Sequence, residues 1–178
     1  VEIDYVPEYT QQETVEVFAN INQASGDIDV ELQSNVETKT FTVSGQSYFY
    51  EPIALEHGEN TVTVTVTDET GAVASDATTI ISDSTGPEIT DVSLSPYVEV
   101  LPESPMTASV SVIDTDSHVE SVTADGQELT EQPDGTWVGE LSAADTNGIH
   151  SVTIAATDSA GNTEYETILY LVGTPVRE

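Results

Sequence analysis

Carboxylates are the residues of this 178-residue chain that could do chemistry, because 33 Asp and Glu stand against two Lys and Arg. Ca²⁺ takes about six to eight hard oxygens from carboxylates and carbonyls. Carboxylates that gather at one place repel one another unless a cation lies among them. We therefore predict a metal site, with Ca²⁺ as the cofactor, where loops would bring four Asp together: Asp83, Asp114, Asp116 and Asp158.

A second, smaller group of carboxylates has the same character and consists of Asp27, Asp29 and Asp68. An alternative interpretation applies to both groups. Asp is a common turn former that accepts hydrogen bonds from its own backbone, so each of these residues could form a separate, solvated Asx-turn.

Catalytic motifs are absent from the sequence. Without cysteine, the chain cannot form disulfides, thiolate nucleophiles or Cys-based zinc sites. The three histidines, His57, His118 and His150, belong to no Gly-x-Ser-x-Gly or His-Glu-x-x-His pattern. With so many carboxylates, a pair at glycosidase separation would arise by chance. We expect a protein that is not an enzyme, with no catalytic and no organic cofactor-binding residues.

Aromatic residues are few, and they gather at Trp137 and at Tyr48, Phe49 and Tyr50. At alternating strand positions such side chains most often fill the core of a sandwich. A flat platform for a carbohydrate is the alternative.

The net charge of −31 is the strongest signal in the composition. It excludes nucleic acid as a direct partner, because phosphate binding needs Lys and Arg. It also excludes binding to an anionic membrane surface, and no apolar run is long enough for membrane insertion. Uncompensated carboxylates repel at low salt, whereas at about 1 M salt the Debye length falls to about 3 Å. The composition therefore favours a protein that works in brine; the alternative is an ordinary acidic surface protein that binds divalent cations.

An internal repeat organises the chain. Residues 58–71 align without a gap with residues 148–161, at a constant offset of 90 residues. The two glycines, the alternating apolar positions and a Thr-Asp pair all match. We therefore predict two domains, 1–83 and 84–178, joined by a short polar segment that ends at Pro87.

Each domain has the pattern of an all-β fold. Val62, Val64 and Val66 alternate with threonines, which is the period of a strand with one buried face. About seven short strands with frequent turns predict two tandem Ig-like β-sandwich domains. The expected strands are residues 15–21, 28–32, 38–43, 48–55, 61–67 and 72–81, then 89–94, 106–113, 119–124, 137–141, 152–157 and 163–172.

The second halves of the repeats resemble the tandem Ig-like domains of bacterial and archaeal cell-surface proteins. The resemblance is carried by Asp134-Gly135-Thr136-Trp137, by Gly148, by the run from Val152 to Asn162, and by the segment from Asp83 to Ile89. In the first repeat, Ala72 stands in the place of Asn162. Related modules hold Ca²⁺ at such junctions, and they occur in S-layers, filaments, adhesins and glycan-active enzymes.

These observations predict a non-enzymatic, extracellular structural module of a prokaryotic cell surface. A halophilic archaeal protein acting as spacer, S-layer or filament subunit is the principal expectation. An adhesin or a carbohydrate-binding accessory module of a secreted enzyme is the alternative. The expected partners are neighbouring Ig-like domains, copies of the chain itself, or a surface glycan or host cell.

Overall fold

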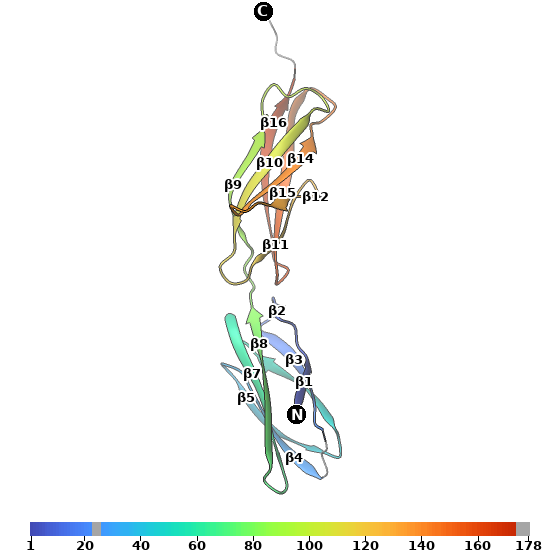
Figure 1. Ribbon diagram of the computed structural model, residues 1–178, viewed down its shortest axis with the longest axis vertical. Helices are drawn as coiled ribbons and strands as arrows, with labels where there is room; N and C mark the ends of the chain where they lie inside the picture. Colours follow the sequence, from blue (N-terminus) through green and yellow to red (C-terminus); the bar gives the residue numbers. More distant parts are fainter. Residues whose placement is uncertain (23–25, 174–178) are drawn as a thin grey trace, which may run out of the picture. The chain divides into compact units, whose positions relative to one another are not determined.

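The computed structural model of the chain describes residues 1–22 and 26–173, and it is entirely built from strands and loops (Figure 1). The chain divides into two compact units, Val1–Ser84 and Thr85–Glu178. The division falls one residue after the boundary that the sequence predicts. The described residues contain no helix with the length and apolarity needed to cross a membrane.

Unit 1 is a sandwich of a three-stranded and a five-stranded sheet. The smaller sheet has the order β1 (Glu2–Tyr5), β3 (Thr14–Asn20) and β6 (Tyr48–Ala54). The larger sheet has the order β2 (Tyr9–Thr10), β8 (Val73–Ser82), β7 (Gly58–Asp68), β4 (Asp27–Gln33) and β5 (Thr38–Ser44).

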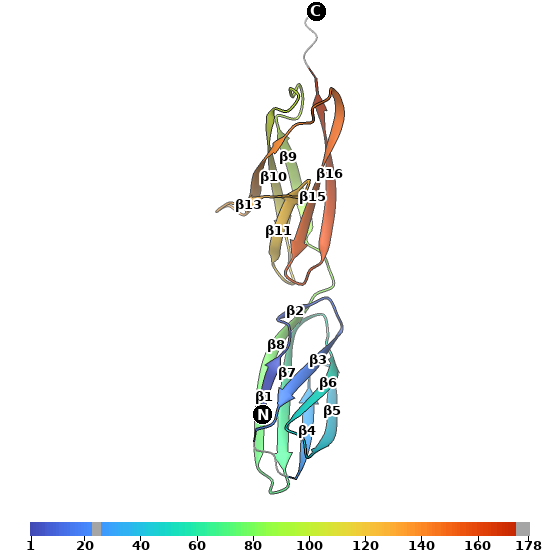
Figure 2. The same ribbon diagram turned by 90° about the vertical axis from the view of Figure 1, so that its right-hand side faces the viewer.

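Unit 2 is a sandwich of two four-stranded sheets, whose layers Figure 2 shows side by side. The first sheet has the order β13 (Thr130–Glu131), β14 (Thr136–Ser142), β10 (Pro105–Ile113) and β9 (Glu88–Ser95). The second has the order β12 (Gln127–Glu128), β11 (Val119–Ala124), β15 (Gly148–Asp158) and β16 (Thr163–Val172).

Alternation of apolar and polar residues builds the core of each unit. In β7, Val62, Val64 and Val66 are buried between the sheets, while the intervening threonines face outward. Val152 and Ile154 do the same in β15. Because side chains of a strand alternate between its faces, each sandwich has its own hydrophobic cluster and two outer faces.

The repeat in the sequence corresponds to two hairpins, β7–β8 and β15–β16, whose strands pair in the same register. In β7–β8 the pairs run from Gly58–Ser82 to Thr67–Val73, and in β15–β16 they run from Gly148–Val172 to Thr157–Thr163. Both hairpins close with the same loop, in which a glycine adopts positive φ, 85° at Gly71 and 92° at Gly161. The offset of 90 residues therefore relates equivalent positions in space.

The all-β prediction is confirmed, and most predicted strands end within a few residues of the observed ones. Four short strands were not predicted from the sequence: β1, β2, β12 and β13. It was also wrong to place the whole aromatic cluster in the core. Phe49 is buried, but Tyr48 and Tyr50 are exposed on the outer face of the β1–β3–β6 sheet. Trp137 is partly buried and packs against the core of unit 2.

Candidate functional site

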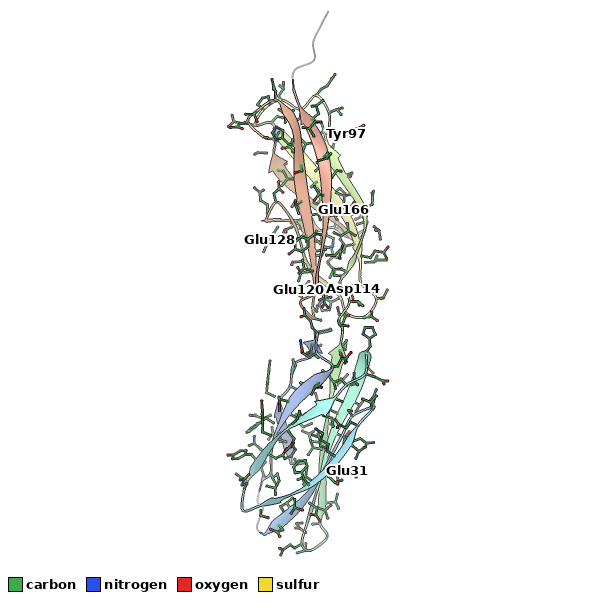
Figure 3. The ribbon with its side chains drawn as sticks, turned by 180° about the vertical axis from the view of Figure 1, so that it is seen from behind. Glu31, Tyr97, Asp114, Glu120, Glu128 and Glu166 are labelled. Carbon is green, nitrogen blue, oxygen red and sulfur yellow. The ribbon has the colours of Figure 1, made fainter. Side chains whose placement is uncertain are left out.

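Two of the predicted metal ligands meet within unit 2. Asp114 follows the last residue of β10, and Asp158 is the last residue of β15. One carboxylate oxygen of Asp114 lies within 4.8 Å of one of Asp158. Figure 3 labels Asp114 at the same end of the unit as Glu120. The pair exists because both strands end at this edge of the sandwich and each carries Asp at its end.

Hydrogen bonds fix the Asp114 carboxylate. Its Oδ1 accepts hydrogen bonds from the Ser117 N–H at 2.6 Å and from the Ser117 hydroxyl at 3.1 Å. Asp114 thus forms an Asx-turn, as the alternative to a metal site expects, and its carboxylate also approaches that of Asp158. Asp116, the neighbouring predicted ligand, does not join this pair among the described residues. Its Oδ2 accepts a hydrogen bond from the Thr85 hydroxyl at 3.2 Å.

Asp158 is buried, and the side chain of Asn162 contacts it. The Asn162 N–H donates to Asp158 Oδ1 at 2.8 Å, and the Asn162 side-chain amide donates to Oδ2 at 2.8 Å. A carboxylate oxygen has two lone pairs, so each of these oxygens can accept one hydrogen bond and still ligate a cation. The donor set of Asp114 and Asp158 therefore fits a hard divalent cation.

The equivalent residue in unit 1 is Asp68, which closes its own turn. Its Oδ1 accepts hydrogen bonds from the Thr70 hydroxyl at 2.6 Å, from the Thr70 N–H at 2.8 Å and from the Ala72 N–H at 2.9 Å. These bonds, the Thr70 hydroxyl foremost, hold the pKa of Asp68 below its ordinary value. Ala72 has no side-chain amide, so this hairpin loop lacks the side-chain hydrogen bond that Asn162 makes in unit 2.

The other predicted ligands lie in unit 1. Asp83 follows β8 and donates its N–H to the carbonyl of Thr10 at 2.8 Å. Asp27 and Asp29 both face outward on β4. Asp27 accepts a hydrogen bond from the Ser44 hydroxyl at 2.5 Å, and Asp29 accepts one from the Thr42 hydroxyl at 2.9 Å. Each of these outward carboxylates thus has a hydroxyl donor on the neighbouring strand.

A serine, a histidine and a glutamate meet in unit 2, and the sequence analysis missed this contact. His118 Nε2 lies 2.8 Å from Ser159 Oγ and 3.6 Å from Glu120 Oε2. In a catalytic triad the acid contacts the other ring nitrogen, so that Nε2 is left for the serine proton. Here both groups approach the same nitrogen, and the His118 and Glu120 side chains are mostly exposed. This geometry does not match that of a triad.

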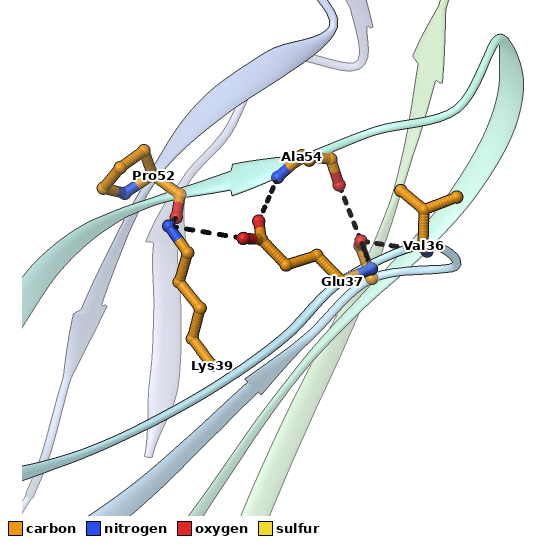
Figure 4. A network of polar contacts seen from close by, with 6 residues as sticks. Val36, Glu37, Lys39, Pro52 and Ala54 are labelled. Atoms are coloured by element: carbon orange, nitrogen blue, oxygen red, sulfur yellow. Dashed lines mark hydrogen bonds and ion pairs between the residues drawn. The ribbon is translucent and has the colours of Figure 1, made fainter.

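The single lysine of the chain ties the two sheets of unit 1 together (Figure 4). Lys39 Nζ donates to the carbonyl of Pro52 and lies 3.9 Å from Glu37 Oε1. The other oxygen of Glu37 accepts the Ala54 N–H at 2.7 Å. Ser34 donates its hydroxyl to the Ala54 carbonyl at 2.6 Å. The positive charge of Lys39 is therefore balanced within the fold.

One end of the outer face of β15 and β16 is apolar, and this feature was not predicted from the sequence. Ile149 is 73% exposed and Leu169 is 61% exposed. The segment that follows β9 extends this surface, because the Leu171 N–H donates to the Tyr97 carbonyl at 3.0 Å. Figure 3 labels Tyr97 at the end of unit 2 opposite to Asp114. Together these strands and this segment form an apolar groove of about 260 Å³, lined by Tyr97, Val98, Ile149, Leu169, Tyr170 and Leu171.

No family model matches this chain, and no curated protein matches it. Solved structures do resemble it. The fibronectin(III)-like modules of Clostridium thermocellum CbhA align with a TM-score of 0.58 at 12% identity, over 94% of this chain and 90% of theirs. The fold is Ig-like and fibronectin-III-like. The predicted class of Ig-like β-sandwiches is therefore confirmed.

Two bacterial adhesins are more distant structural neighbours. A Ca²⁺-stabilised adhesin with which an Antarctic bacterium binds ice aligns at a TM-score of 0.49 and 21% identity, over 94% of this chain and 46% of that one. A 1.5-MDa bacterial ice-binding adhesin aligns at 0.45 and 20%, over 90% of this chain and 57% of that one. At these identities the likeness concerns the fold alone.

Proposed function

We propose that this chain is a non-enzymatic structural module of an extracellular prokaryotic surface assembly. In this proposal the sandwiches act as spacers, and copies of the chain associate through the apolar outer face of β15 and β16. The exposure of Ile149 and Leu169 in so acidic a chain is the observation that carries the proposal. Contiguous apolar surface of this kind marks interaction sites on soluble proteins.

This face is uncharged along both strands. Its outward residues in β15 are Ile149, Ser151, Thr153, Ala155 and Thr157, and in β16 they are Thr163, Tyr165, Thr167, Leu169 and Leu171. Two copies that each carry a net charge of −31 repel one another over their acidic surfaces. An apolar, uncharged face complements itself in a two-fold contact. A second copy is therefore the partner that fits this face.

Unit 1 shows that the fold does not require an apolar face here. At the positions equivalent to Ile149 and Leu169, unit 1 has Glu59 and Thr79, which are both exposed. At these two positions the hairpin is thus polar in unit 1 and apolar in unit 2. Because the core of each sandwich lies on the opposite side of these strands, the apolar residues of unit 2 add nothing to its own core.

The acidic composition fits assembly in brine, and we propose a halophilic archaeal source. High salt screens the repulsion between copies, while it strengthens or leaves intact the association of apolar faces. Association through β15 and β16 should therefore increase with NaCl.

Analytical ultracentrifugation of the full chain in about 2 M NaCl tests the assembly. We expect concentration-dependent association of the wild type and monomers of Leu169→Glu, because this change places a charge in the centre of the face. Thr79→Glu is the matched control at the equivalent position of unit 1, and it should associate like the wild type. A monomeric wild type, or equal behaviour of the two variants, would contradict the proposal.

We further propose that Ca²⁺ binds at Asp114 and Asp158. In melting experiments at fixed ionic strength, millimolar Ca²⁺ should raise the unfolding temperature of unit 2 and leave that of unit 1 unchanged. Asp114→Asn should abolish this effect, because it removes one of the two converging charges. Asp68→Asn in unit 1 is the control, and it should preserve the effect. A Ca²⁺ response that survives Asp114→Asn would refute the site.

A further inference from the structure

The outer face of the β1–β3–β6 sheet in unit 1 carries four aromatic side chains. Tyr5, Phe18 and Tyr50 are cross-strand neighbours, because Tyr5 pairs with Phe18 and Phe18 pairs with Tyr50. Tyr48 lies two residues from Tyr50 on the same face, and its ring centroid is 5.7 Å from that of Phe18. We call these four residues the aromatic platform.

The platform faces solvent. Tyr5 is 72% exposed, Tyr50 59% and Tyr48 49%, whereas the alternate residues of the same strands fill the core. Neighbouring strands lie about 4.8 Å apart, so the row from Tyr5 to Tyr50 spans about 10 Å. Exposed rings at these positions do not serve the hydrophobic core, and a row of this length can seat more than one sugar ring.

Carboxylates border the platform on the same face. Glu16 lies one outward position before Phe18 on β3, and Glu2 pairs with Asn20, which in turn pairs with Tyr48. Both glutamates are exposed. The lysine of unit 1 does not offset them, because Lys39 lies beside Glu37. The face therefore combines ring surfaces, hydrogen-bond acceptors and negative charge.

This combination identifies the chemistry of a ligand. Tyrosine rings offer flat apolar surface on which the C–H face of a sugar can stack, and their hydroxyls remain free for hydrogen bonds. A cation over such a ring is attracted by the ring quadrupole, and nearby carboxylates strengthen the attraction. Anionic glycans would be repelled. We propose that the aromatic platform binds a polysaccharide whose sugars carry protonated amino groups.

The platform differs in kind from the apolar face of unit 2. Its members are aromatic and mostly tyrosine, with glutamates at its border, whereas Ile149, Leu169 and Leu171 form an aliphatic, uncharged surface. Two copies meeting at the platform would bring Glu2 and Glu16 against like charges. Glycan binding in unit 1 is therefore independent of self-association through unit 2. An experiment can contradict one of these two proposals and leave the other intact.

Titration calorimetry with a glucosamine hexamer tests the proposal, at a pH that keeps its amines protonated. About 1 M NaCl suppresses general attraction between this cation and the acidic chain. We expect the wild type to bind, and the double variant Tyr48→Ala and Tyr50→Ala to bind about tenfold more weakly. This estimate assigns about 0.5–1 kcal/mol to each exposed ring. Val73→Ala, which removes an exposed apolar side chain from the other sheet of unit 1, should bind within about twofold of the wild type.

Two further arms test the ligand class. The N-acetylated hexamer should bind more weakly than the amine, and Glu16→Gln should weaken binding of the amine while leaving the acetylated hexamer unaffected. Equal binding by the wild type and the double tyrosine variant would overturn the platform as the site. Equal binding of the two hexamers would overturn the amine requirement. A double variant with unchanged melting but altered self-association would show that the face joins protein copies, which also overturns the proposal.

Discussion

Asn60 offers a sharp test of how polar contacts hold unit 1 together. The residue is fully buried at the start of β7, and its side chain makes three hydrogen bonds to the preceding loop. Its Oδ1 accepts the Glu56 N–H at 2.9 Å, and its amide donates to the carbonyls of Glu56 at 2.7 Å and Gly58 at 2.9 Å. Asn60→Ala removes all three bonds in one step.

The expected loss follows from the groups left behind. A buried polar group that loses its partner costs about 1–3 kcal/mol. Because Glu56 is exposed and Gly58 is half-buried, water can reach part of this loop, and we expect a total of about 2–3 kcal/mol. For a unit of this size, 1 kcal/mol shifts the unfolding temperature by about 4–8 °C. Asn60→Ala should therefore lower the unfolding temperature of unit 1 by about 10–20 °C.

Calorimetry of the full chain measures the shift, and hydrogen exchange of the β7 amides assigns it to unit 1. Thr61→Ala is the control, because the Thr61 side chain is exposed on the neighbouring position of the same strand. Asn60→Asp extends the test. This variant keeps an acceptor for the Glu56 N–H but turns a carboxylate toward the carbonyls of Glu56 and Gly58. Its loss of stability should be smaller in acid, because a protonated carboxyl can donate a hydrogen bond to one of these carbonyls. A shift for Asn60→Ala no larger than that for Thr61→Ala would refute the reasoning.

Three further predictions concern charge and polar contacts. The unfolding temperature should rise from about 0.1 to 2 M NaCl, because screening relieves repulsion among the carboxylates; a flat or falling curve contradicts this. Asp68→Ala should destabilise unit 1 near neutral pH and lose this effect in acid. The Asp68 pKa is lowered by folding, so its contribution is present above the ordinary value and disappears as the pH falls through the folded one; a loss independent of pH would count against it. Ser34→Ala should cost unit 1 about 1–2 kcal/mol in urea unfolding, because the hydroxyl bonded to Ala54 is lost, whereas Ser44→Ala should cost less.

The sequence predicted the hairpins well because their patterns are local. Strict alternation in Val62 to Thr67 and a glycine in each turn determine both the strands and their register. The meeting of Asp114 with Asp158 was also predictable, since each lies at the end of a strand and both strands end at the same edge. The short strands β1 and β2 were not, because they depend on pairing with distant strands rather than on their own few residues.

The outer faces were the least predictable feature. Residues 168–172 form a continuous apolar run, and the sequence does not say which members point outward. Only the pairing of β16 with β15 places Leu169 and Leu171 outside and Tyr170 inside. The same holds for Tyr48, Phe49 and Tyr50, whose alternation predicts two faces but not which face is buried. Both proposed interaction surfaces therefore consist of residues whose outward direction the sequence alone does not predict.

The free edge of β16 limits the kind of polymer that this chain can form. Over its last residues the edge is already paired, because Val100 donates its N–H to the Leu171 carbonyl and accepts the Gly173 N–H. Nearer the start of the strand, Glu164 and Glu166 lie exposed. Paired or charged edges resist the strand-to-strand joining that produces irreversible cross-β fibres. Copies that associate through the side chains of β15 and β16, rather than through this edge, should form a material that dissolves on dilution of salt and reassembles when the salt returns.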